Sequence, residues 1–309
     1  MASALTPLAS SKPRERSARE RRRRTGMSGG VFTLPAVILV LLIFFVPLGM
    51  SVYMSFNDWP LLGAPHLNGV ANYQQTFSDT QFFKSLWFTL VYTVVVTALG
   101  FLISLALALL VHLPRRGAGI FRTAYFVPVV TGLAATSFLW SWMYNGQVGV
   151  FSGILRAIGL ADGPVQFLDS PTRAFWSVVV MMLWKTVGFT MLVLLIGMQS
   201  IPDELFEAAR IDGAGSFKIL RSITLPLMIR PITLTLVLSV TGSLLAFEQF
   251  FITTRGGPAN STLTVVNWLY SQAFVIFKLG YASALAMILL IVIVAINMVQ
   301  VFFLRKDVS

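Results

Sequence analysis

Glu207-Ala208-Ala209-Arg210-Ile211-Asp212-Gly213 is a short charged stretch that separates two long apolar runs of this chain, and Ile223-Thr224-Leu225-Pro226 follows it. Pro202 suits the first turn of a helix, and Gly213 suits the left-handed residue that ends one. A second short helix is predicted over residues 217–223, before the proline. Because the core of a bilayer offers charged groups no partners, the whole stretch is expected to lie outside the membrane.

The composition is that of a membrane protein. Hydrophobic residues make up 56% of the 309 positions and charged residues only 11%, whereas soluble domains carry roughly a quarter charged residues. The net charge of +11 would suit nucleic-acid binding in a soluble protein, but here the charges sit at the ends of apolar segments, which is typical of membrane orientation. The absence of cysteine excludes disulfides, thiol catalysis and Cys-based metal sites. We therefore expect the chain to contact a lipid bilayer and no nucleic acid.

Six apolar segments are long enough to cross a hydrocarbon core, which needs roughly 20 helical residues. Backbone groups in lipid must be paired within the segment, and alternation of polar and apolar residues at the strand period is absent, so the segments are expected to be helices. The sequence thus predicts an all-α membrane protein with one transmembrane domain over residues 31–309. The spans are expected near residues 34–54, 86–112, 123–143, 174–199, 228–252 and 281–304.

The basic residues predict the orientation of the chain. Residues 1–30 include the run from Arg21 to Arg24 and are expected to form a disordered basic tail before an uncleaved membrane anchor. With this tail in the cytoplasm, most of the 23 Lys and Arg residues fall on the cytoplasmic side. Both termini and the stretch around Glu207 are therefore predicted to be cytoplasmic. Apolar residues at helical spacing near 151–160 predict a short helix on the opposite surface.

The spacing of the charged stretch resembles the EAA loop of binding-protein-dependent ABC importer permeases: Glu-Ala-Ala, three residues, Gly, nine residues, then Ile-x-Leu-Pro. Other stretches resemble the later spans of carbohydrate-importing members of this family, and Gly256-Gly257-Pro258 resembles the maltose- and glycerol-phosphate-type first permease of a pair. These stretches are Phe121 to Pro128, Trp184 to Phe189, Ile201-Pro202, Thr254 to Pro258, Thr262, and Gly280 to Ala284. The resemblance implies a type I ABC importer transmembrane domain, with six transmembrane helices and a cytoplasmic coupling helix in the loop 200–226.

The resemblance also implies partners. A second permease, two ATP-binding subunits and an extracytoplasmic solute-binding protein would complete a transporter in the cytoplasmic (inner) membrane of a bacterium or archaeon. ATP and Mg would be bound by the ATP-binding subunits, so this chain is expected to hold no cofactor and no metal and to catalyse no reaction. Those subunits would contact the coupling helix and drive uptake of a sugar or sugar-like solute. The coupling residues are expected to be Glu207, Ala208, Ala209, Asp212 and Gly213.

Candidate solute contacts are taken from the resemblance to the maltose-type permease, because sugars are held by polar groups and aromatic rings. They are Lys185, Thr186 and Phe189 in the fourth span and Ser239, Gly242, Ser243 and Ala246 in the fifth. Thr136 in the third span is added for its polarity and depth alone. Ser243 and Ala246 stand where the maltose protein has asparagines, and Phe189 stands where it has tyrosine, so maltose itself is not favoured.

Lys185 allows several interpretations. A lysine near mid-span faces a cavity or a partner charge, but it can also reach the membrane surface or brace Glu248. If Lys185 and Glu248 carried coupling ions, the chain would be a secondary transporter, for which we would expect an internal repeat, and the sequence shows none. A membrane enzyme would need a cluster of catalytic side chains, yet His66 and His112 are predicted on opposite sides of the membrane. Small polar residues such as Ser243 also serve helix packing. The matched EAA loop favours the importer.

Overall fold

The computed structural model describes residues 33–112 and 118–306, so the predicted basic tail at 1–30 lies outside the described residues. The chain divides into two units, residues 1–53 and 54–309. In the first unit, an apolar helix begins at Thr33 and passes through a π-helical turn, η1 (Leu41–Phe45), into α2 (Val46–Ser55). Its strongly apolar composition suits a helix surrounded by lipid.

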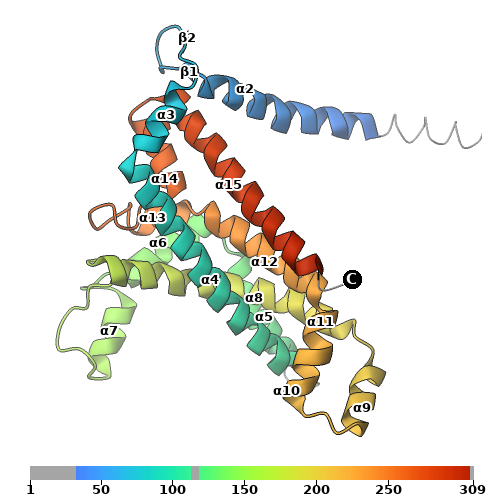
Figure 1. Cartoon of the computed structure of the whole chain (residues 1–309). Helices are drawn as coiled ribbons and strands as arrows, with labels where there is room; N and C mark the ends of the chain where they lie inside the picture. The colour runs from blue at the N-terminus through green and yellow to red at the C-terminus, as the bar shows by residue number, and fades with distance from the viewer. Residues whose placement is uncertain (1–32, 113–117, 307–309) are drawn as a thin grey trace, which may run out of the picture. The chain divides into compact units, whose positions relative to one another are not determined.

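The second unit is mostly helical (Figure 1). Its helices are α3 (Ala71–Ser78), α4 (Thr80–His112), α5 (Ala118–Val130), α6 (Leu133–Met143), α7 (Val150–Ala157), α8 (Pro171–Gln199), α9 (Asp203–Ile211), α10 (Ser216–Ile219), η2 (Leu220–Thr224), α11 (Leu225–Leu227), α12 (Ile229–Leu244), α13 (Glu248–Thr253), α14 (Val265–Tyr270), η3 (Ser271–Val275) and α15 (Leu279–Lys306). A short antiparallel pair, β1 (Asn57–Asp58) with β2 (His66–Leu67), lies at the end of the unit opposite α9 and α10.

Four described helices are long and apolar enough to cross a membrane: Thr33–Ser55, α4, α8 and α15. Two bent pairs bring the number to six if each pair is one span. One pair is Gly119–Val130 with Leu133–Met143, bent by 98°, and the other is Ser216–Leu227 with Ile229–Leu244, bent by 73°. This arrangement agrees with an all-α protein that crosses the membrane several times.

The span boundaries differ from the sequence-based ones in three places. The predicted third span, 123–143, is broken after α5, which contains Pro128, a residue that cannot donate a backbone hydrogen bond. The predicted fifth span, 228–252, ends at Leu244, and α13 is a separate helix. The second span begins at Thr80 rather than residue 86, because Asp79 accepts a hydrogen bond from the Phe82 amide at 3.0 Å and caps the first turn of α4.

Buried hydroxyl groups follow one face of α4. Ser85, Thr89, Thr93 and Thr97 are buried and recur every four residues, so they share a face of the helix. Thr97 bonds to Ser239 of α12 at 3.1 Å, and Thr89 accepts a hydrogen bond from the Val265 amide of α14 at 3.0 Å. Although α4 is mostly apolar, its buried hydroxyl groups form hydrogen bonds that hold α12 and α14 against it.

Asp79 joins three elements at the end of the unit that carries β1 and β2. Its carboxylate accepts hydrogen bonds from Trp268 Nε1 of α14 at 2.9 Å and from the Tyr281 hydroxyl of α15 at 2.6 Å. Burial opposes ionisation of Asp79, but the hydrogen bonds from Tyr281, Phe82 and Trp268 outweigh it and hold the pKa of Asp79 below its usual value. The charged carboxylate thus stabilises the contact of α4 with α14 and α15.

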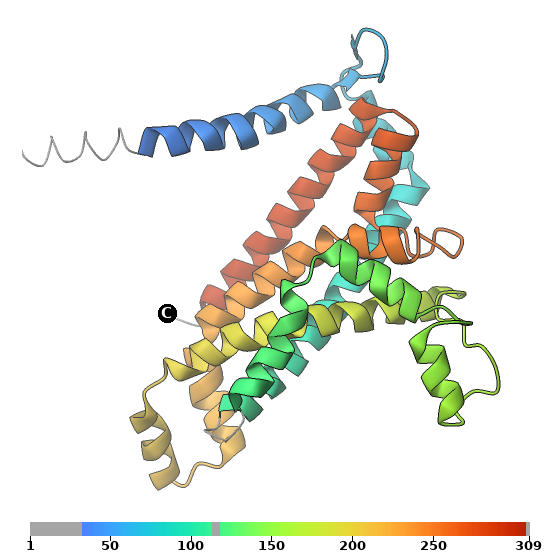
Figure 2. The ribbon, with the colours of Figure 1, turned by 180° about the vertical axis from the view of Figure 1, so that it is seen from behind.

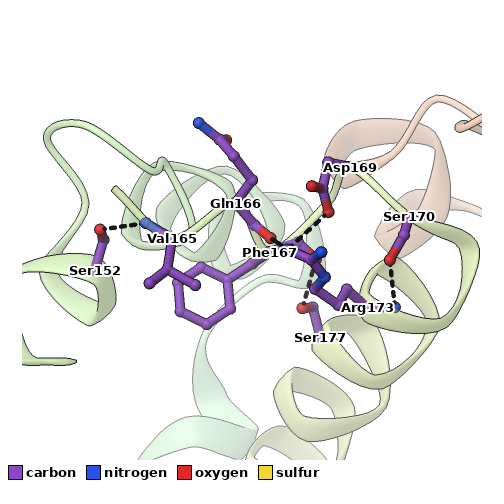
Figure 3. Close-up of polar contacts among 8 residues, drawn as sticks. All are labelled: Ser152, Val165, Gln166, Phe167, Asp169, Ser170, Arg173 and Ser177. Carbon is purple, nitrogen blue, oxygen red and sulfur yellow. Dashed lines mark hydrogen bonds and ion pairs between the residues drawn. The ribbon is translucent and has the colours of Figure 1, made fainter. Parts of the chain in front are cut away.

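The segment between α7 and α8 is tied to both helices (Figure 3). Ser152 of α7 accepts a hydrogen bond from the Val165 amide at 3.0 Å. Arg173, in the first turn of α8, donates to the Gln166 carbonyl at 2.8 Å and forms an ion pair with Asp169 at 3.2 Å. The helix α7 overlaps the stretch 151–160 where the sequence predicted a short surface helix, and this loop connects it to the first turn of α8.

Candidate functional site

A cavity of about 560 Å³ lies within the second unit, between α4, the α5–α6 break, α8, α12 and the start of α13. Its apolar walls include Val129 and Leu133, which flank the break, and Phe189 of α8. The polar lining consists of Lys185, Thr186, Thr190, Thr235, Ser239, Ser243, Glu248 and Gln249. Hydroxyls, an amide and an aromatic ring therefore line the same partly open cavity.

Helical spacing explains which residues reach the cavity. In α8 the lining residues Met182, Lys185, Thr186 and Phe189 lie three or four positions apart, and in α12 they recur in the same way from Thr235 to Ser243. One face of each helix therefore looks into the cavity.

The structure brings most of the sequence-predicted solute residues to this cavity. Those that line it are Lys185, Thr186, Phe189, Ser239, Gly242 and Ser243. Ala246 does not, because it is only 1% exposed and is buried in a cluster with Tyr92 and Phe250. Thr136 is 3% exposed and its hydroxyl bonds to Thr131 at 3.0 Å, so it too lies away from the lining.

Lys185 bonds to backbone rather than to another side chain. Its Nζ atom donates to the Thr131 carbonyl at 2.6 Å and to the Pro128 carbonyl at 3.2 Å, both at the α5–α6 break. Lys185 and Glu248 both line the cavity and attract each other electrostatically. Two of the three ammonium donors are thus already used by the protein.

Several lining hydroxyls donate to their own helix and keep their lone pairs for another donor. Thr186 donates to the Met182 carbonyl at 2.7 Å, and Thr235 donates to the Pro231 carbonyl at 3.0 Å. A hydroxyl that donates to backbone in this way can still accept a hydrogen bond. The cavity therefore presents mainly acceptors, which suit a solute rich in hydroxyl donors.

The loop between α8 and α12 forms a second exposed site. Glu207, Ala208, Asp212 and Gly213 are exposed, and Ala209 is half-buried. Gly213 has φ +74°, the left-handed conformation that ends α9. The sequence predicted this helix and its glycine stop.

One side chain of α9, Phe206, packs against the rest of the second unit, and most other residues of this helix are exposed. Phe206 packs on the apolar cluster around Met198 and Met228, whereas Ile211 is 86% exposed and Phe217, just beyond α9, is 75% exposed. The predicted second helix at 217–223 is instead the continuous run of α10, η2 and α11. A charged side chain and large apolar side chains are therefore available together to a partner.

Among the residues that the structure describes, no three His, Asp or Glu side chains come together as a group that could hold a metal ion. The described part of the chain presents two features of interest, a partly open cavity with several polar groups in its lining and an exposed helical loop at one end of the unit.

Comparison with known proteins identifies the family. Residues 100–306 match the family described as binding-protein-dependent transport system inner membrane component. The chain belongs to this family. It is 31% identical over 278 residues to the probable ABC transporter permease protein YurN of Bacillus subtilis (strain 168), covering 89% of this chain and 95% of that protein.

Two further similarities concern proteins named for a transported solute. The permease is 32% identical over 276 residues to the sulfoquinovosyl glycerol transport system permease protein SmoG of Agrobacterium fabrum (strain C58), covering 88% of this chain and 89% of that protein. Its fold matches a bacterial ABC transporter involved in the import of alginate with a TM-score of 0.79 and 23% identity, covering 94% of this chain and 99% of the other. The second match shows the fold alone.

These findings confirm the type I ABC importer permease fold. They also confirm that the permease is a subunit of a binding-protein-dependent ABC importer, a non-catalytic membrane subunit. Sequence reasoning missed Thr190, Thr235 and Gln249 in the cavity lining. Thr190 follows Thr186 by four residues and Thr235 precedes Ser239 by four, so helical periodicity alone would have found both.

Proposed function

We propose that this permease moves a sugar or sugar-like, hydroxyl-rich solute into the cytoplasm through the cavity between α4, α8 and α12. The observation that supports the proposal is the lining, which contains several hydroxyls that can accept a hydrogen bond, the Gln249 amide, the Glu248 carboxylate and the ring of Phe189. Sugars bind such surfaces because their hydroxyls donate to the acceptors and their apolar faces rest on rings. The similarity to a permease named for sulfoquinovosyl glycerol transport supports a glycoside-like solute.

The energy for transport would come from partner subunits that hydrolyse ATP and hold both ATP and Mg. We place their contact on α9, where Glu207, Ala208 and Asp212 are exposed and Ala209 adds little bulk. The small alanines permit close approach of a partner, and Glu207 offers a charged acceptor. Two ATP-binding subunits, a second permease and an extracytoplasmic solute-binding protein complete the proposed transporter.

The orientation proposed for the permease follows the distribution of Lys and Arg. Arg210, Lys218 and Arg221 favour a cytoplasmic position for the α9–α10 end, and the β1–β2 end would then face outward toward the solute-binding protein. Both chain termini would be cytoplasmic, and the protein would reside in the cytoplasmic (inner) membrane of a bacterium or archaeon.

Co-purification tests this assembly. The tagged permease is extracted from its native membrane in mild detergent, and the bound proteins are identified by mass spectrometry. We expect an ATP-binding subunit and a second permease, and the solute-binding protein encoded nearby would then be screened against sugars by calorimetry. A permease that purifies alone and still transports solute in liposomes without ATP would contradict the proposal.

A further inference from the structure

The break in the third span interrupts the regular backbone hydrogen bonding of the helix. The helix α5 ends at Val130 and α6 begins at Leu133, with a bend of 98° between them. The last carbonyls of a helix have no intrahelical donor and carry the negative end of its dipole. Inside a membrane they need another donor, because lipid supplies none.

Lys185 of α8 supplies that donor. Its Nζ atom lies 2.6 Å from the Thr131 carbonyl and 3.2 Å from the Pro128 carbonyl, so one ammonium group bridges the end of α5 and the connection to α6. The Pro128 carbonyl also accepts hydrogen bonds from the Thr131 amide at 3.3 Å and from the Thr131 hydroxyl at 2.6 Å. A cation at the C-terminal end of a helix is favourable, and more so where water is scarce.

A glycine one turn away fixes the same two helices at a second point. A Cβ atom on Gly188 would overlap the carbonyl oxygen of Tyr125, so the backbones of α8 and α5 touch there. Lys185 precedes Gly188 by three residues, and Pro128 follows Tyr125 by three. The two contacts therefore fix the antiparallel helices in one register. Figure 2 shows the green α5 next to the yellow-green α8.

We propose that Lys185 is a positioning residue that holds the α5–α6 break, and that it shapes the cavity through Val129 and Leu133 rather than by binding solute. These two apolar residues flank the break and line the cavity, so the angle of the break sets the position of that wall. With two of its donors used by carbonyls, Lys185 leaves Glu248 as the charged group most available to a solute. This role does not depend on the identity of the solute.

Two introduced cysteines can measure the break directly, because the chain contains none of its own. Ile120 of α5 and Leu139 of α6 are both exposed, and each is replaced by Cys and spin-labelled in the transporter assembled with its partners in nanodiscs. We expect Lys185→Met to broaden or shift the distance distribution between the labels. We expect Lys185→Arg to preserve it, because a guanidinium can donate to both carbonyls. Thr186→Val, one residue away and also on the cavity, serves as the matched control and should leave the distribution unchanged.

Transport kinetics give an independent readout. A positioning role predicts that Lys185→Met lowers the maximal uptake rate about tenfold or more with little change in KM, and that Lys185→Arg restores most of the rate. An unchanged distance distribution in Lys185→Met, or a raised KM that Lys185→Arg does not correct, would overturn the proposal. If Lys185→Met does not assemble, Lys185→Gln takes its place, because its shorter, uncharged side chain cannot bridge both carbonyls, and an unaltered distribution in that variant would overturn the proposal as well. If the permease does not transport a sugar, the unsubstituted transporter would show no sugar uptake, while the effect of Lys185→Met on the distance distribution would remain.

Discussion

The exposed helix α9 and the cavity differ in what their side chains touch. Glu207, Asp212 and Ile211 of the α9 region point away from the body, whereas Lys185 and Ser239 at the cavity bond to other elements of the same chain. The residues exposed on α9 lie close together in sequence. A cavity between helices assembles residues from distant parts of the sequence, so only the first could be recognised as one continuous stretch.

The largest effect is expected at α9. The double substitution Glu207→Ala with Gly213→Pro should lower solute-stimulated ATP hydrolysis roughly 100-fold while the permease stays inserted and assembled. Proline cannot adopt the φ of +74° found at Gly213, so the end of α9 would be rebuilt, and the exposed carboxylate would be lost as well. The measurement is ATPase activity of the reconstituted transporter. Glu204→Ala, in the first turn of the same helix, is the control, and equal loss in that variant would argue against a specific contact.

The next effect is expected where α8 touches α5. Gly188→Val should destabilise the permease by about 1–3 kcal/mol or more, because its side chain would overlap the Tyr125 carbonyl. Thermal unfolding in detergent measures this effect. Gly119→Val, on α5 with open space around its Cβ position, is the matched control and should change the midpoint little. A Gly188→Val protein as stable as the control would show that the two backbones are not in contact.

A smaller effect is expected within the cavity. Ser243→Ala should raise KM for uptake about two- to tenfold and leave the maximal rate unchanged, the loss typical of one hydrogen bond made equally in the bound and transition states. Ser141→Ala, a serine of α6 that bonds to its own helix, is the control. A lowered rate at unchanged KM would instead assign Ser243 to helix packing.

The smallest effect concerns Asp79, at the opposite end of the unit from α9. Asp79→Asn should lower stability at neutral pH by about 1 kcal/mol, because two side-chain hydrogen bonds lose their charged acceptor. The pKa of Asp79 lies below its usual value, so the carboxylate stabilises the folded state above pH ~4 and this contribution is lost as the pH falls through the lowered pKa. The difference in thermal midpoint between the wild type and Asp79→Asn should therefore shrink below pH ~4. A constant difference from pH 7 to pH 3 would contradict this account.

The fold and the helix α9 could be predicted from the sequence because both depend on patterns of neighbouring residues. Apolar runs reveal membrane helices, and Gly213 marks the end of α9. The sequence did not predict the break in the third span, although Pro128 lies near the end of α5. A proline in a membrane helix can produce a slight kink or a complete break, and the sequence alone does not distinguish the two. The partners of Lys185 were also beyond prediction, since they are backbone carbonyls more than fifty positions away. Ala246 was expected at the solute site from the resemblance alone, and the sequence does not show that it is buried in a cluster with Tyr92 and Phe250.

We propose that a partner subunit contacts α9 and hydrolyses ATP, and that this hydrolysis drives a hydroxyl-rich solute through the cavity. The most direct test is uptake of a radiolabelled sugar, chosen by the solute-binding protein, into proteoliposomes that hold the assembled transporter with ATP inside. The account predicts ATP-dependent uptake that Glu207→Ala with Gly213→Pro abolishes and that Ser243→Ala weakens only at low solute concentration. Uptake that continues without ATP, or that the α9 variant leaves intact, would contradict it.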